Sequence, residues 1–142
     1  MSFLSSLEVS ASGLSAQRTR VNLAASNLAN AESTRGPDGG PYRRLDPVLT
    51  ARPFADALGA ADPSAPGLGV EVTAVVADQG PGRRVYSPGH PDADPQGFVV
   101  FPDVNPISEV VNLMSAARSY DANATAIDTL KTMASRALDI AH

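Results

Sequence analysis

The prolines and glycines of this chain are confined to its middle, and this distribution limits where long helices can form. All 12 prolines lie between positions 37 and 106, and ten of the 11 glycines lie between 36 and 97. Because a proline inside a helix removes a hydrogen bond and clashes with the preceding turn, the two proline-free ends can be helical and the middle mostly cannot. The chain therefore divides into an N-terminal helical segment (1–36), a β and loop region (37–104) and a C-terminal helix (105–142).

The N-terminal segment has the apolar spacing of a helix that pairs with other helices. Positions separated alternately by three and four residues form one row, which only Arg18 interrupts: Leu4, Leu7, Ala11, Leu14, Arg18, Val21, Ala25 and Leu28. This heptad spacing is typical of a coiled-coil seam. The opposite row is polar but uncharged, which suits hydrogen bonds to neighbouring chains; it consists of Ser15, Thr19, Asn22, Ser26 and Asn30.

The C-terminal segment predicts a second long helix that begins at Asn105 and Pro106. Asn is a favoured helix cap, and Pro suits the first helical position. The apolar row then continues by threes and fours through Val110, Leu113, Ala117, Tyr120, Ala124, Ile127, Leu130, Ala134, Ala137 and Ala141. A helix of about 34 residues extends about 50 Å at 1.5 Å per residue, so we expect an elongated molecule.

The middle region reads as short strands separated by turns. The strongest strand pattern is at 69–77, where apolar and polar residues alternate, and 42–52 is expected to be an edge strand because it contains Pro47. Two further short strands are predicted at 83–86 and 97–101, and a loop at 53–68. The expected fold is mainly α with a small β insertion, in which the terminal helices pair as a coiled-coil-like core.

Composition excludes several classes of function. Leu, Ile, Val and Phe make up 32 of the 142 residues, too few for the dense core of a compact enzyme. The net charge of −4 disfavours binding to nucleic-acid phosphates. The absence of Cys excludes disulfides and thiolate chemistry. No apolar stretch is long enough for a membrane span, and the N-terminus lacks the pattern of a cleaved secretory signal.

One cluster resembles a catalytic or metal site: His90, Asp92 and Asp94 could together ligate a metal and serve a small metal-dependent enzyme. They lie between prolines in a predicted surface loop, where Asp side chains more often bond the backbone of a turn. We therefore favour a proline-stiffened turn and expect no metal. The basic pairs Arg43-Arg44 and Arg83-Arg84 are interpreted as solvated strand ends, with contact to an acidic partner as the alternative.

The two helical ends could form a hairpin within one monomer, but two Ala-rich helices bury little surface. Apolar burial at about 25 cal/mol per Å² would barely offset an ordering cost of about 1.5 kcal/mol per residue. The sequence therefore favours assembly with other chains. A secreted coiled-coil adaptor of a general kind is one alternative that fits the long neutral helices.

Particular motifs point to a family. The segment 11–20, reading ASGLSAQRTR, followed by Asn22 and by SNLANA at 26–31, resembles the N-terminal signature of the bacterial flagellar rod and hook family. Three later segments resemble the proximal rod subunits of that family: GPDGGPYRR at 36–44, YSPGHPDAD at 86–94 with Gly97-Phe-Val, and NPISEVVNLMSAARSYDAN at 105–123.

The resemblance implies a structural protein of the flagellar basal body, in the rod that crosses the periplasm and transmits torque. It implies export in an unfolded state through the flagellar type III apparatus, without a cleaved signal. The implied partners are further copies, other proximal and distal rod subunits, and the adaptor between the MS ring and the rod. No catalytic residue, cofactor, metal, nucleic acid or small-molecule substrate is expected.

The expected subunit interface combines the shared family motif with the two apolar rows. From the motif it takes Asn27, Leu28 and Asn30. From the rows it takes Leu7, Leu14, Val21, Leu113, Ala117, Tyr120, Ala124, Ile127 and Leu130.

Overall fold

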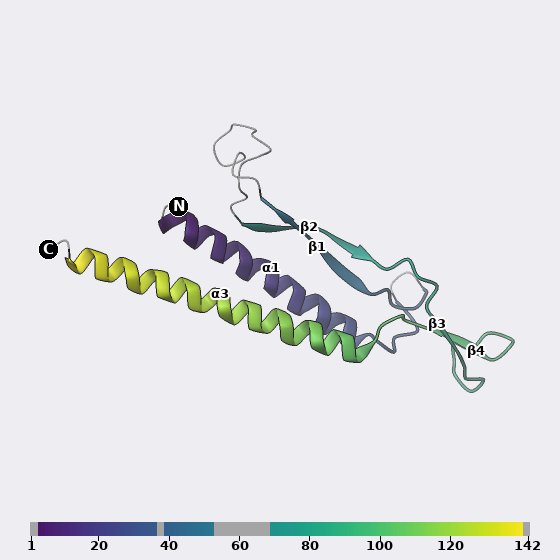
Figure 1. Cartoon of the computed structure of the whole chain (residues 1–142). Coiled ribbons are helices and arrows are strands. Elements are labelled where there is room, and N and C mark those ends of the chain that lie inside the picture. The colour runs from purple at the N-terminus through teal and green to yellow at the C-terminus, as the bar shows by residue number, and fades with distance from the viewer. Residues whose placement is uncertain (1–2, 37–38, 53–68, 141–142) are drawn as a thin grey trace.

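Two long helices form most of the molecule. The structure, a computed structural model, describes residues 3–36, 39–52 and 69–140. Helix α1 (Phe3–Ala29) and helix α3 (Pro106–Ile140) lie antiparallel along each other, so the start of α1 and the end of α3 lie at the same end of the molecule (Figure 1). The predicted mainly α fold with a small β part is confirmed; the predicted loop at 53–68 lies outside the described residues.

Helix α3 begins where the sequence predicts. The Asn105 side-chain oxygen accepts hydrogen bonds from the backbone N–H of Ile107 (3.0 Å) and Ser108 (3.4 Å). These bonds satisfy two of the N–H groups that lack partners in a first helical turn. The helix then continues for 35 residues. No helix in the described part of the chain is both long and apolar enough to cross a membrane.

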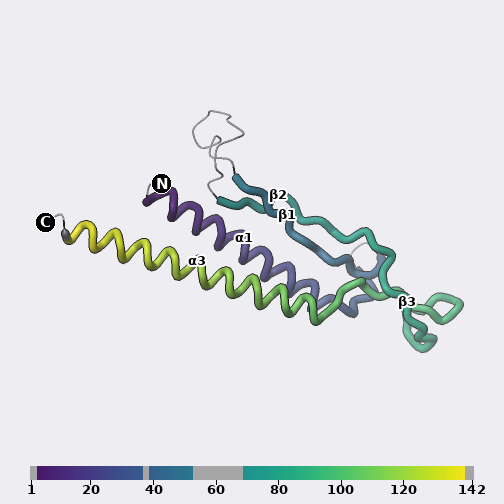
Figure 2. Tube along the Cα trace, viewed as in Figure 1, coloured from purple at the N-terminus to yellow at the C-terminus, as the bar shows by residue number. Residues whose placement is uncertain are grey.

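The four predicted strands form two antiparallel pairs (Figure 2). Strand β1 (Leu45–Ala51) pairs with β2 (Val70–Ala77), and the register shifts between Val48 and Leu49. Strand β3 (Arg83–Tyr86) pairs with β4 (Phe98–Phe101). Helix α1 contacts both β1 and β2 as well as α3, whereas the β3–β4 pair projects beyond the end of the helices where α3 begins (Figure 1).

The interior is small and is built largely from small side chains. Ala16 and Ala24 of α1 and Ala116 of α3 are buried, as are Val99 of β4 and Val104, two residues before α3. Such small residues allow the helix backbones to approach closely. At Gly13 a Cβ atom would lie only 3.0 Å from the Nδ2 atom of Asn123, so glycine suits this close approach.

The buried face of α1 differs from the predicted apolar row. Its buried residues are Ala16, Ala24 and Asn27, none of which belongs to that row. Within the row itself, one set of positions is exposed, namely Leu4, Ala11, Arg18 and Ala25, and the other is half-buried, namely Leu7, Leu14, Val21 and Leu28. The reason is that α1 contacts α3 and the β1–β2 pair at the same time, and residues of a single narrow row cannot make both sets of contacts.

Candidate assembly interface

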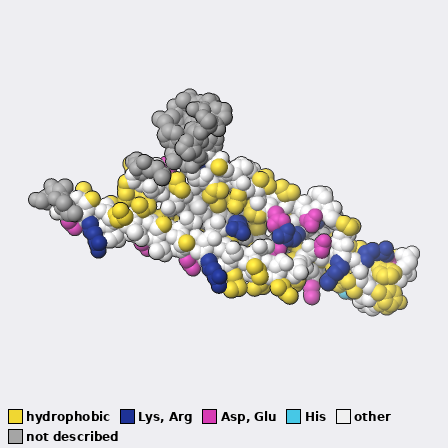
Figure 3. All heavy atoms as spheres, viewed as in Figure 1, with side chains coloured by type: hydrophobic (Ala, Val, Ile, Leu, Met, Phe, Trp, Pro, Cys, Tyr) yellow, Lys and Arg dark blue, Asp and Glu magenta, His cyan; other side chains and the backbone are white. Residues whose placement is uncertain are grey.

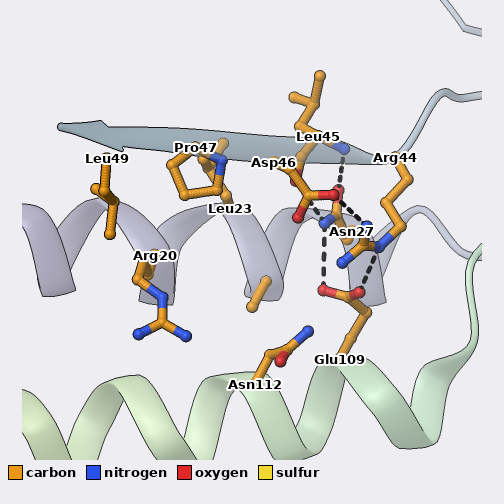
Figure 4. Close-up of a pocket in the computed structure, with 11 residues that line it drawn as sticks. Arg20, Leu23, Asn27, Arg44, Leu45, Asp46, Pro47, Leu49, Glu109 and Asn112 are labelled. Atoms are coloured by element: carbon orange, nitrogen blue, oxygen red, sulfur yellow. Dashed lines mark hydrogen bonds and ion pairs between the residues drawn. The ribbon is translucent and has the colours of Figure 1, made fainter. Parts of the chain in front are cut away.

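A buried polar junction joins the two helices to β1, and its centre is Asn27. The Asn27 side chain is 1% exposed. Its Oδ1 accepts a hydrogen bond from the backbone N–H of Leu45 (2.9 Å), and its Nδ2 donates to the Leu45 carbonyl oxygen (2.9 Å) (Figure 4). One side chain thus bonds both backbone groups of a strand residue, as a neighbouring strand would. These bonds fix β1 against α1.

The remaining hydrogen-bond donor and acceptor positions of the Asn27 side chain are also used. Tyr42 donates its hydroxyl hydrogen to Oδ1 (2.9 Å), and Nδ2 donates to the Oε2 atom of Glu109 (3.2 Å). A carboxamide can accept two hydrogen bonds and donate two, so all four positions are filled. Asn27 therefore connects α1, the segment before β1, β1 itself and α3.

Glu109 supplies the charge of this junction. It is 1% exposed and lies in the first turn of α3, where the helix dipole favours a carboxylate. Arg44 donates from Nε to its Oε1 atom (2.7 Å) and pairs with Asp46 as well. Burial lowers the pKa of the Arg44 guanidinium, but the hydrogen bond and charge of Glu109 and the charge of Asp46 outweigh this effect, and the pKa is raised. Arg44 is thus an internal partner rather than a solvated strand end.

Beside the junction lies a groove of about 440 Å³ between β1, α1 and α3. Arg20 reaches from α1 toward α3 across it, and Asn112 faces it from α3 (Figure 4). The Arg20 guanidinium donates to the Gln17 side chain (3.0 Å). The other charged groups that line the groove, Arg44, Asp46 and Glu109, are paired with one another, and we assign no reaction to this groove.

The residues of the alternative metal site serve other purposes. Asp94 accepts hydrogen bonds from the backbone N–H of Phe98 (2.8 Å) and Gln96 (2.9 Å), which confirms the predicted turn at this position. Asp92 instead accepts from Thr34 (2.7 Å) and pairs with Arg35, so it ties the turn to the segment that follows α1. Among the described residues, no three His, Asp or Glu side chains come close enough together to hold a metal ion.

We expect the Asp94 turn to loosen in acid. Backbone hydrogen bonds from Phe98 and then Gln96, with the charge of Arg84, hold the pKa of Asp94 below its ordinary value. A lowered folded-state pKa means that the stabilisation is present above the unfolded value of about 3.9 and is lost as the pH falls through the folded value. In NMR titrations, the Phe98 and Gln96 amide signals should move in that range. Asp94→Asn should abolish the movement, and Asp103→Asn, an exposed control, should not.

The expected interface residues occupy different environments. Asn27 is buried in the junction, and the Asn30 side chain donates to the Ser26 carbonyl oxygen (2.9 Å) at the end of α1. Tyr120 is exposed. The others are half-buried and retain surface that another chain could cover: Leu7, Leu14, Val21, Leu28, Leu113, Ala117, Ala124, Ile127 and Leu130. Their role in subunit contacts stays a prediction.

Comparison with known proteins matches both helices to flagellar families. The family model described as flagella basal body rod protein matches residues 7–37, and that of the flagellar basal body rod FlgEFG protein C-terminal matches residues 96–140. Asn27 and Glu109 lie in these two segments.

Curated relatives match along the whole chain. They include flagellar basal-body rod protein FlgC of Escherichia coli O6:H1 and of Salmonella typhimurium, each 44% identical over 99% of this chain and 98% of the relative. FlgC of Bacillus subtilis is 39% identical over 99% of both chains. Two long antiparallel helices with a small β part beside them, together with these matches, define a structural protein of the flagellar basal-body rod rather than an enzyme. Within that class, the chain belongs to the FlgC family.

Proposed function

We propose that this subunit polymerises through α1 and α3 into the proximal part of the rod. In this proposal the segments 1–36 and 105–142 of many subunits pair as a coiled-coil-like core. The region 37–104 forms a layer outside that core. The observation that carries the proposal is that the long helices enclose so few buried residues within one chain, which leaves every described position of their apolar rows half-buried or exposed.

The proposed partners are those that the family resemblance implies. They are further copies of this chain, the other proximal and distal rod subunits, and the adaptor that joins the rod to the MS ring. Before assembly the chain passes through the flagellar type III export apparatus in an unfolded state. In the rod, which crosses the periplasm, torque passes through many packed contacts. A mechanical role of this kind requires rigid joints between secondary-structure elements, and the Asn27–Glu109 junction supplies one inside each subunit.

Amide hydrogen exchange tests the proposal. In the purified subunit we expect a monomer whose helix ends, near residues 3–10 and 130–140, exchange rapidly. Few side chains are buried there, so local opening has a low free energy. Protection should be greatest near Asn27 and Glu109. In purified basal bodies, protection should rise along both helices and most at those ends, while β1 and β2 change little.

The opposite result would be strong protection throughout residues 5–30 and 107–140 in a monomer. Helices that are already stable alone would not need neighbours, and the proposal that assembly completes the helical core would then be wrong.

A further inference from the structure

Helix α1 bonds the β1–β2 pair at a second place, Ser12, which lies about four turns before Asn27. The Ser12 Oγ atom accepts a hydrogen bond from the backbone N–H of Val70 (3.1 Å), the first residue of β2. The same hydroxyl donates a hydrogen bond to the Val9 carbonyl oxygen (2.7 Å) within α1. Both the donor and an acceptor position of this side chain are thus used, and one of its bonds joins the helix to a strand.

The Val70 N–H is available to Ser12 because it points away from β1. The Gly69 carbonyl oxygen accepts a hydrogen bond from the Arg52 N–H (3.0 Å), which follows β1. Within a trans peptide group the carbonyl oxygen and the following N–H point in opposite directions. Ser12 therefore binds an N–H on the outer edge of β2.

Asn27 binds β1 by the same geometry. The Arg44 carbonyl oxygen accepts a hydrogen bond from the Asp78 N–H (2.8 Å), so the following N–H, that of Leu45, points away from β2 and reaches Asn27. Asn27 thus holds the outer edge of one strand and Ser12 the outer edge of the other. Each contact is at the first residue of its strand, and the strands are antiparallel, so the two contacts lie at opposite ends of the pair (Figure 1).

Glycine at position 69 allows β2 to approach Ser12 closely. Gly69 has a φ of +123°, and a Cβ atom there would lie only 2.5 Å from the Ser12 Oγ atom and 3.2 Å from its Cβ atom. A residue with a side chain would be strained at this φ and would push the strand away from the helix. The next residue of α1, Gly13, is the one that faces Asn123 of α3 at close range. Residues 12 and 13 therefore contact β2 and α3, as Asn27 contacts β1 and α3.

Apolar packing does not fix the position of the β1–β2 pair. None of the described residues of β1 or β2 is buried. Four of their apolar side chains are between 37% and 50% exposed, namely Val48, Leu49, Val75 and Val76. Figure 3 shows hydrophobic side chains at the surface over this pair. Because densely interdigitated side chains are what normally hold elements in place, the hydrogen bonds at the two ends take on that role here.

We propose that Ser12 is a positioning residue, which together with Gly69 forms a Ser12 joint that fixes the direction of the β1–β2 pair along α1. A strand pair held at one end can pivot about that end, whereas a pair held at two points about 22 Å apart cannot. The Ser12 joint has one hydrogen bond from a half-buried side chain, whereas the buried Asn27 makes two to Leu45. The Ser12 joint therefore opens more readily, and its opening frees one end of the pair while the Asn27 end stays attached.

The joint has a consequence for the mechanical role. This consequence rests on the proposed function, in which the region 37–104 forms a layer outside a helical core. A strand pair that pivots would absorb rotation of the helices, whereas a pair fixed at both ends moves with α1. The joint itself is a property of the single chain, so it can be measured without assembly.

Distances between spin labels in the purified subunit test the proposal, and the labels are attached to introduced cysteines because the natural chain contains none. One label pair, Thr50 of β1 with Thr125 of α3, lies toward the Ser12 joint. The other, Val76 of β2 with Ser108 of α3, lies toward Asn27. All four positions are exposed. Ser12→Ala should broaden the distance distribution of the first pair and leave that of the second unchanged.

Ser10→Ala is the matched control. It removes a hydroxyl from the same helix that also bonds within α1, to the Ser6 carbonyl oxygen (3.0 Å). Positions 10 and 12 are two residues apart, so they lie on different faces of the helix. Ser10→Ala should leave both distance distributions unchanged.

Amide hydrogen exchange provides a second measurement that needs no label. In Ser12→Ala the Val70 N–H should exchange about fivefold faster, as expected for the loss of one hydrogen bond, and the Leu45 N–H should be unaffected.

Two results would overturn the inference. One is that Ser12→Ala matches the unsubstituted subunit in its distances and in Val70 exchange. The other is that it broadens both label pairs, because the whole strand pair would then have detached instead of pivoting. Absence of the unsubstituted chain from purified basal bodies would instead contradict the proposed function and leave the joint standing.

Discussion

Replacing Asn27 by alanine should destabilise the subunit by about 3–4 kcal/mol. The substitution removes four hydrogen bonds and leaves the backbone groups of Leu45 and one oxygen of Glu109 without these partners. Each buried polar group left unsatisfied costs about 1–3 kcal/mol, and water entering from the adjacent groove offsets part of the sum. Urea unfolding followed by circular dichroism would measure the change.

Asn22→Ala provides the matched control. Asn22 lies on the same helix and is exposed. Both substitutions gain the same few tenths of a kcal/mol in helix propensity. The difference between their free energies of unfolding therefore measures the contribution of the Asn27 hydrogen bonds. Equal stabilities for the two variants would show that the Asn27 hydrogen bonds contribute nothing to the fold.

Leu28→Asp should prevent rod assembly and abolish motility. Leu28 is half-buried within one chain, next to Asn27 in the motif expected at the subunit interface. If a neighbouring subunit covers the rest of this side chain, the new carboxylate is desolvated without a partner, at a cost on the order of several kcal/mol. The cost recurs at each equivalent contact of a polymer. Motility assays and immunodetection in purified basal bodies would measure the outcome.

The control for this experiment is Ala29→Asp, which places the same charge on the neighbouring residue of α1, at an exposed position outside the apolar row. Circular dichroism of both purified variants separates a folding defect from an assembly defect. Normal motility with Leu28→Asp, and the variant subunit present in basal bodies, would mean that this side chain is not buried between subunits.

Local sequence signals were sufficient to predict the secondary structure. The positions of the prolines and glycines distinguish the helical ends from the strands of the middle region. Asn105-Pro106 marks the start of α3, because helix capping depends on adjacent residues alone. The strand predicted at 69–77 corresponds to β2 at Val70–Ala77, and the one predicted at 83–86 to β3. These features depend on a few neighbouring residues, which a single sequence displays directly.

The polar junction could not be predicted in the same way. Asn27 was identified through the family motif, but as an interface residue, whereas its side chain bonds Glu109, which is 82 positions away in the chain. Glu109 itself resembles an ordinary acidic residue in the first turn of a helix. Arg44 resembles the basic end of a strand until Glu109 and Asp46 are placed beside it. The sequence does contain one signal. Asn27 lies between Ser26 and Leu28 of the apolar row, inside a predicted helix, where Asn is not a favoured residue.

The two hydrogen bonds between the Asn27 side chain and the backbone of β1 also have a consequence for aggregation. A strand with one open edge is a template on which a strand of another molecule can add, and such addition leads toward amyloid. One edge of β1 is paired with β2. On the other, Asn27 occupies both backbone groups of Leu45, and Pro47, two residues further on, has no N–H to donate. If the subunit polymerises as proposed, this edge of β1 is therefore protected from pairing with a strand of another copy.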